Sequence, residues 1–139
     1  IRLDPVVYDS DIVITHMPEE SHAGRDLANF RKQTGRGARL SAHLHEMYAR
    51  ELFVAGTDED FLRAEAFFAD SVKDTERSAS ELTEACCVVT RAARLRGDTA
   101  TFFKHVCKVI AGDGCSEICC ELGHFYADCN LSGWLDLLL

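Results

Sequence analysis

Hydrophobic residues recur at intervals of three and four from residue 40 to near the end of the chain. Five stripes of this kind are separated by residues typical of helix ends, and each stripe predicts an amphipathic helix. The stripes run from Leu40 to Leu52, Phe61 to Val72, Leu82 to Ala93, Phe102 to Ile110 and Ile118 to Cys129. A further helix is expected to begin at Leu131.

Capping residues mark the ends of these predicted helices. Ser78, followed three residues later by Glu81, has the spacing of a capping box, and Asp98 can cap the next helix. Glycines are expected to end helices, at Gly56, Gly97, Gly112 and Gly114. Helices this short, joined by short loops, favour antiparallel hairpins stacked against one another.

An internal repeat supports the stacking. If Gly56, Gly97 and Asn130 are equivalent turns, their spacings are 41 and 33 residues. The second is close to the period of about 34 residues in tetratricopeptide repeats. In the best-preserved repeat, Leu122, Gly123 and Tyr126 match the L-G-x-x-Y pattern, in which the glycine lets two helices approach closely. We therefore expect a mainly α protein, with its hairpins stacked as a tetratricopeptide-like superhelix.

The beginning of the chain has a different pattern. It contains both prolines and a β-branched run from Ile12 to Thr15, which predicts one short strand between loops. Leu27 and Phe30 then indicate a short linker helix. The predicted organisation is a remnant of a preceding domain, a linker helix and a truncated helical-repeat domain, over residues 1–23, 24–39 and 40–139.

Composition excludes several classes of partner. The net charge of −8 and the pI near 5.1 argue against binding to nucleic acid, which requires a basic face. No apolar run approaches the roughly 18 residues of a membrane span, and a cytoplasmic location is expected. The odd number of cysteines, seven, suggests reduced thiols, and we expect helical packing to bury them, notably Cys86, Cys107, Cys115, Cys119 and Cys120.

The order of these features resembles one family. The strand that ends in DIVITHMPEES, then GRDL, a linker and a YARELF helix are similar to the C-terminal third of bacterial family-2 glycosyltransferases with a helical-repeat tail. Their I-x-H-x-P-E-x-S pattern is matched by Ile14, His16, Pro18, Glu19 and Ser21. The chain departs from the family at Met17, where a second histidine is common, and in its final LSGWLDLLL.

The resemblance implies that a nucleotide-sugar-binding domain of the glycosyltransferase A fold precedes this chain, and that the β segment is left from it. His16 would then complete the coordination of a divalent Mn or Mg ion, although it can equally be a loop histidine. Glu19, Ser21 and Arg25 would contact the donor phosphates, although a polar interdomain loop is the alternative. Asp9 and Asp11 form a D-x-D, but the family's metal-binding carboxylates lie well upstream, so solvated turn carboxylates are expected here.

Two functions remain open. In the first, the parent enzyme transfers a sugar from a nucleotide-sugar donor to an acceptor protein or glycan, and the repeats bind the acceptor or a second copy. The alternative is a non-enzymatic adaptor that binds a peptide or a partner protein. Residues expected to contact partners are Tyr48, Thr90, Tyr126 and Trp134. This chain by itself is expected to be inactive, to bind no metal, and to self-associate through its apolar C-terminal end.

Overall fold

Helices make up all the regular structure that the computed structural model describes. It describes residues 5–7, 9, 11 and 22–138, with the backbone alone for 22–24 and 131–138. The described helices are α1 (His22–Gly35), α2 (Ala42–Ala55), α3 (Asp58–Lys73), α4 (Ala79–Leu95), α5 (Thr99–Ile110) and α6 (Ser116–Leu138). The mainly α class is confirmed. The predicted strand over residues 12–15 lies outside the described residues.

Local capping sets where the helices begin. The predicted capping box is confirmed, because the Ser78 hydroxyl accepts from the Glu81 N–H while the Glu81 carboxylate accepts from the Ser78 N–H. Asp98 caps α5 as predicted, accepting from the Thr101 N–H at 3.0 Å. A second capping box, formed by Thr57 and Asp60, begins α3 and was not predicted. These caps satisfy N–H groups that have no partner within the helix.

Glycine ends two of these helices for different reasons. Gly97, just after the C-cap Arg96 of α4, has a φ of 75°, which side chains other than glycine adopt at a cost. Gly56, the C-cap of α2, has an ordinary φ of −71°. Glycine is needed at this position because a Cβ at Gly56 would lie only 2.5 Å from the Leu52 carbonyl oxygen.

The last helix differs from its prediction. α6 runs without interruption from Ser116 to Leu138, so the expected turn at Asn130 and the separate helix beginning at Leu131 are both wrong. The segment has no proline, and each of its two glycines, Gly123 and Gly133, costs only about 1 kcal/mol within a helix. The 33-residue spacing therefore marks no repeat. Gly123 is exposed, and among the described residues an added Cβ would meet nothing within 4 Å, so its predicted role in close helix approach is wrong too.

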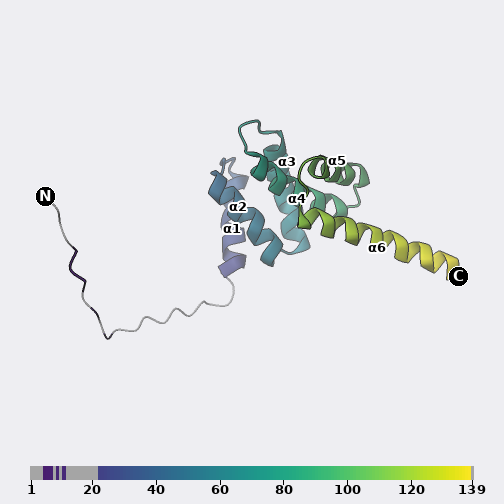
Figure 1. Cartoon of the computed structure of the whole chain (residues 1–139), viewed down its shortest axis with the longest axis horizontal. Helices are drawn as coiled ribbons and strands as arrows, with labels where there is room; N and C mark the ends of the chain where they lie inside the picture. Colours follow the sequence, from purple (N-terminus) through teal and green to yellow (C-terminus); the bar gives the residue numbers. More distant parts are fainter. Residues whose placement is uncertain (1–4, 8, 10, 12–21, 139) are drawn as a thin grey trace.

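The fourth helix is the centre of the packing. α4 contacts α2, α3, α5 and α6, while α1 packs against α2 and α3 (Figure 1). Leu27 and Phe30 of α1 are buried, and the Phe30 ring stacks on Tyr48 with their centroids 5.0 Å apart. The segment predicted as a linker thus joins the helical core. Beyond this body, α6 projects toward the C-terminus (Figure 1).

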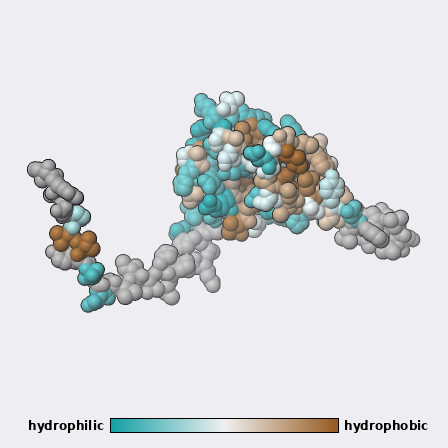
Figure 2. Space-filling view, viewed as in Figure 1, coloured by the Kyte–Doolittle hydropathy of each residue, from teal (hydrophilic) through white to brown (hydrophobic). Residues whose placement is uncertain are grey.

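The described core has two clusters that share α4. The first joins α1 to α4 and includes Leu27, Phe30, Leu40, Tyr48, Leu52, Phe61, Phe68, Val88 and Val89. The second joins α4, α5 and α6 and includes Cys86, Cys87, Ala93, Phe102, Val106, Val109 and Ile118. In the view of Figure 2, hydrophilic surface covers much of the side of α1 to α3, and apolar surface gathers toward α5. No helix in the described part of the chain has the length and apolar character of a membrane span.

The cysteines do not all share the predicted burial. Cys86 and Cys87 are buried on α4, and Cys115 is half-buried. The prediction is wrong for Cys107, Cys119 and Cys120, which are exposed. On α6 the inner face consists of Ile118, Glu121, Leu122 and Phe125, and the cysteines lie beside it.

Candidate functional site

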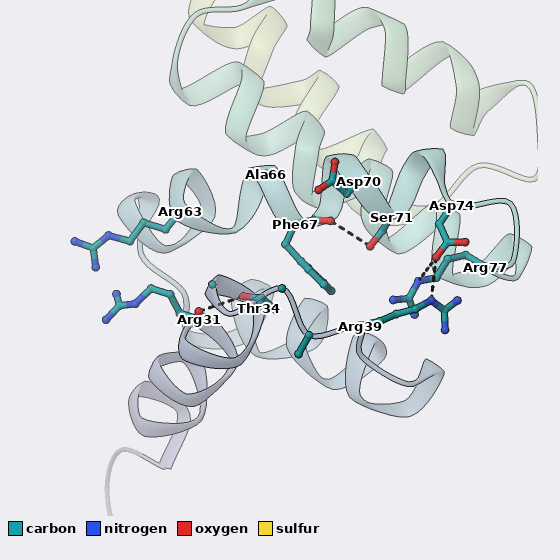
Figure 3. Close-up of a pocket in the computed structure, with 13 residues that line it drawn as sticks. Arg31, Thr34, Arg39, Arg63, Ala66, Phe67, Asp70, Ser71, Asp74 and Arg77 are labelled. Carbon is teal, nitrogen blue, oxygen red and sulfur yellow. Dashed lines mark hydrogen bonds and ion pairs between the residues drawn. The ribbon is translucent and has the colours of Figure 1, made fainter.

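A cavity of about 380 Å³ opens between α1, the loop that follows α1, and α3 (Figure 3). Its described lining contains four arginines, Arg31, Arg39, Arg63 and Arg77, and two aspartates, Asp70 and Asp74. Cationic groups therefore outnumber anionic groups two to one in this lining, although the whole chain carries a net charge of −8. The cavity is a local exception to the acidic character of the protein.

At one end of the cavity the charges are already paired. The Arg39 Nε donates to Asp74 Oδ2 at 3.1 Å. Arg77 is 6% exposed, and its Nη1 donates to the Leu40 carbonyl at 2.9 Å and to Glu81 Oε2 at 2.6 Å. The pKa of Asp74 is lowered, chiefly because its carboxylate accepts from the Glu76 N–H, and also because of Arg39. This end holds the loop before α2 against the beginning of α4.

At the other end, two guanidinium groups extend on the same side. Figure 3 shows Arg31 on α1 and Arg63 on α3 with their side chains roughly parallel. Arg63 pairs with Glu59 one turn earlier, with both side chains largely exposed. Exposed pairs of this spacing contribute about 0.3–0.5 kcal/mol, so a competing anion can displace Glu59. Among the described residues, no ion pair involves Arg31.

An aromatic ring lies between the two ends. Phe67 of α3 is half-buried, and its ring centroid lies 5.0 Å from that of Phe68 and 5.8 Å from that of Tyr48. Ala38 and Ala66 also line the cavity and extend the apolar surface. The site can therefore accept an apolar group beside an anionic group.

This arrangement is suited to binding. Arginine stays protonated in proteins and cannot act as a general base, but its planar fork binds carboxylates and phosphates with two hydrogen bonds. The hydroxyls in the lining are engaged, since Thr34 donates to the Phe30 carbonyl at 2.9 Å and Ser71 to the Phe67 carbonyl at 3.3 Å. Within the described ranges, no three histidine, cysteine or acidic side chains gather as a metal site would require.

Of the residues expected to contact a donor or metal, Arg25 is the one that lies within the described part of the chain. His16, Glu19 and Ser21 lie outside the described residues. Arg25 is exposed in the first turns of α1 and is not part of the cavity lining. Asp9 and Asp11, the predicted turn carboxylates, are exposed.

Of the residues expected to contact partners, the three whose side chains are described, Tyr48, Thr90 and Tyr126, are not brought together. Tyr48 and Thr90 are 2% and 0% exposed and lie inside the helical body, where no partner can reach them. Tyr126 is 52% exposed on α6. Trp134 lies on α6, but its side chain and the apolar C-terminal end expected to self-associate are outside the described side chains. Tyr48 and Thr90 are inaccessible because the helices around α2 and α4 enclose the faces on which they lie.

The arginines of the cavity had no local signature in the sequence. Arg31 and Arg63 are 32 residues apart, on helices whose contact is a property of the fold. Both lie at exposed positions of amphipathic helices, where an arginine is common. Comparison of this chain with protein-family models, with curated proteins and with solved structures found no match.

Proposed function

We propose that the helical part of this chain is a binding module that holds an acidic peptide segment of a partner protein in the cavity between α1 and α3. The observation that carries the proposal is that Arg31 and Arg63 extend side by side from one end of the cavity that Phe67 lines (Figure 3). Carboxylates of the peptide pair with the two guanidinium groups, and an apolar side chain rests on the Phe67 ring. This is a non-enzymatic, adaptor-like role.

Charge complementarity favours a peptide with acidic residues. The rest of an acidic chain repels anions, so an acidic segment is attracted specifically to this cavity. A volume of about 380 Å³ accommodates a few side chains. The packing of α1 against α2, of α3 against α4 and of α5 against α6 also supports a finer proposal, that the hairpins stack as in tetratricopeptide proteins, which commonly present such surfaces.

Fluorescence anisotropy tests the peptide proposal directly. The labelled peptide is an octamer of alternating glutamate and leucine, and an octamer of alternating lysine and leucine is its control. We expect the acidic peptide to bind and the basic one not to bind. We also expect affinity to fall as salt is raised, because the contact is electrostatic.

Two variants locate the peptide site. The double substitution Arg31→Gln and Arg63→Gln should weaken binding about tenfold, since two exposed ion pairs of roughly 0.7 kcal/mol each sum to about 1.4 kcal/mol. Arg50→Gln is the matched control, because Arg50 is an exposed arginine with its own pair one turn earlier, Glu46. Equal affinities in the double variant and the control would overturn the proposal.

A second proposal rests on the resemblance over residues 11–27. In it, the helical module serves a metal-assisted glycosyltransferase and helps to bind the acceptor, with His16 as a candidate ligand of Mn or Mg. Calorimetry of this chain with UDP-glucose and Mn²⁺ should give no binding heat, whereas a longer natural protein that contains it should bind. Absence of a D-x-D carboxylate pair upstream in that longer protein would contradict this second proposal.

A further inference from the structure

Two thiols from distant parts of the chain are in contact away from the arginine-lined cavity. The Cys87 and Cys115 sulfurs are 3.3 Å apart and come from residues 28 positions apart. Cys87 lies within α4, and Cys115 immediately precedes α6. Both are free thiols in this structure. We propose that Cys87 and Cys115 are a redox-active pair that forms a reversible disulfide linking α4 to the beginning of α6.

The remaining separation is small enough for the backbone to close. A disulfide has a sulfur–sulfur bond of about 2.0 Å, so the sulfurs must approach by roughly 1.3 Å. Cys115 lies in the connection between α5 and α6, directly after Gly114, whose φ is 69°. A short connection can shift more easily than a packed helix, so most of the movement falls on Cys115.

A second cavity makes the pair accessible. It has a volume of about 330 Å³, lies between α2, α4 and the beginning of α6, and is lined by both cysteines together with Phe53, Val54 and Glu84. Cys115 is half-buried and Cys87 is 3% exposed. Burial also raises the pKa of the Cys87 thiol, which makes it the poorer first nucleophile. Cys115 therefore reacts first.

The oxidant is a low-molecular-weight disulfide such as oxidised glutathione. The Cys115 thiolate attacks one sulfur of the oxidant, forming a mixed disulfide and releasing one thiolate. Cys87 then loses its proton and attacks the Cys115 sulfur, which releases the second small thiol. Two protein thiols and one small disulfide thus become one protein disulfide and two small thiols, and excess reductant reverses the reaction.

The test uses the full chain with the four exposed cysteines replaced, as Cys107→Ser, Cys119→Ser, Cys120→Ser and Cys129→Ser. After incubation with oxidised glutathione, intact mass spectrometry should show the loss of two hydrogens, and tryptic peptides should be joined through Cys115. The melting temperature of the oxidised form should rise by roughly 5–10 °C, because the bridge restrains the unfolded chain. Dithiothreitol should reverse both changes.

Neighbouring cysteines provide matched controls. Cys86 is buried on the same helix, so Cys86→Ala should keep the bridge, whereas Cys87→Ala should abolish it. Cys115→Ala should also abolish the bridge, and it leaves α4 unchanged. It replaces Cys87→Ala as the test if circular dichroism shows that Cys87→Ala does not fold. A folded protein that loses no hydrogens on oxidation overturns the proposal, and so does a bridge through Cys86.

Discussion

At the scale of single residues, His45 shows how burial sets a protonation state. Its side chain is fully buried, with its ring centroid 5.1 Å from that of Phe68. Burial lowers its pKa to about 4, and the charge of Arg77 adds to the effect. The neutral ring carries its hydrogen on Nδ1, because Glu84 Oε2 lies 3.1 Å away as an acceptor. The other ring nitrogen, Nε2, has no hydrogen-bond partner among the residues that the structure describes.

The buried histidine predicts a loss of stability on acidification. Between about pH 6.5 and pH 4 the unfolded chain binds a proton at His45 that the folded chain does not, so stability falls as pH falls. The loss attributable to His45 between pH 7 and pH 5 is about 2 kcal/mol. Urea denaturation at these two pH values measures it.

Two variants separate the contribution of His45 to the pH dependence of stability from the contributions of other titratable groups. His45→Gln should remove its share of the pH dependence, while His43→Gln, at an exposed position on the same helix, should leave the dependence unchanged. Burial raises the pKa of Glu84, and this acts in the opposite sense, stabilising the fold as pH falls toward 4.5. Glu84 is therefore kept in both variants, and an equal pH dependence in the two would count against the argument.

A buried charge ties α6 to α4. Glu121 is 0% exposed, and its two oxygens accept from Arg91 Nε at 2.6 Å and from Arg94 Nε at 2.7 Å. The Arg91 guanidinium also lies over the Phe53 and Phe61 rings, 4.8 and 4.6 Å from their centroids. The carboxylate is satisfied at both oxygens, which offsets the cost of its burial.

Removing this charge should destabilise the protein. Glu121→Gln keeps the shape but leaves two partly buried arginines without their anion, and should cost roughly 3 kcal/mol. Glu117→Gln, at an exposed position one turn earlier, should cost at most about 0.5 kcal/mol. Chemical denaturation of both variants checks this, and similar losses would mean that Glu121 is not a structural anchor.

At the scale of the elements, the helix ends depend on chemistry within a few residues. The connection between α2 and α3 is Gly56 and Thr57, which means that the last turn of one helix and the first cap of the next are adjacent. The Gly56 N–H donates to the Leu52 carbonyl at 2.8 Å. A turn this compact leaves no room for a side chain at Gly56.

Alanine substitutions at Gly56 and at Gly123 should change the stability of the protein in opposite directions. Gly56→Ala places a Cβ against the backbone of Leu52 and should destabilise the protein by about 2 kcal/mol. Gly123→Ala fills open space within α6 and should stabilise it by roughly 0.5–1 kcal/mol, because alanine is the better helix former. Thermal unfolding measures both, and stabilisation at position 56 would contradict the close approach.

At the scale of the whole molecule, α4 connects the two hydrophobic clusters. Ala85, Val88 and Val89 belong to the first cluster, while Cys86 and Cys87 belong to the second. Because the helix turns about 100° per residue, neighbouring positions face different partners. Because both clusters contain residues of α4, disrupting the packing of one cluster also destabilises the other.

This arrangement predicts a single cooperative unfolding transition. Far-ultraviolet circular dichroism, which reports helix, and near-ultraviolet circular dichroism, which reports aromatic packing, should give the same denaturant midpoint. Val88→Ala should shift both midpoints together, since Val88 is fully buried in α4. Two separated transitions would show instead that the clusters unfold independently.

The sequence by itself determined the helical class and most helix boundaries, because caps such as Ser78 and turns such as Gly97 act within one or two turns of the chain. It indicated the apolar face of each helix, but not which polar side chains and cysteines are enclosed. Glu121 lies inside while Cys119 and Cys120 lie outside, and Asn130 ends no helix. The arginine-lined cavity and the contact of Cys87 with Cys115 likewise exist only in the tertiary structure, because each joins residues about 30 positions apart through the packing of different helices.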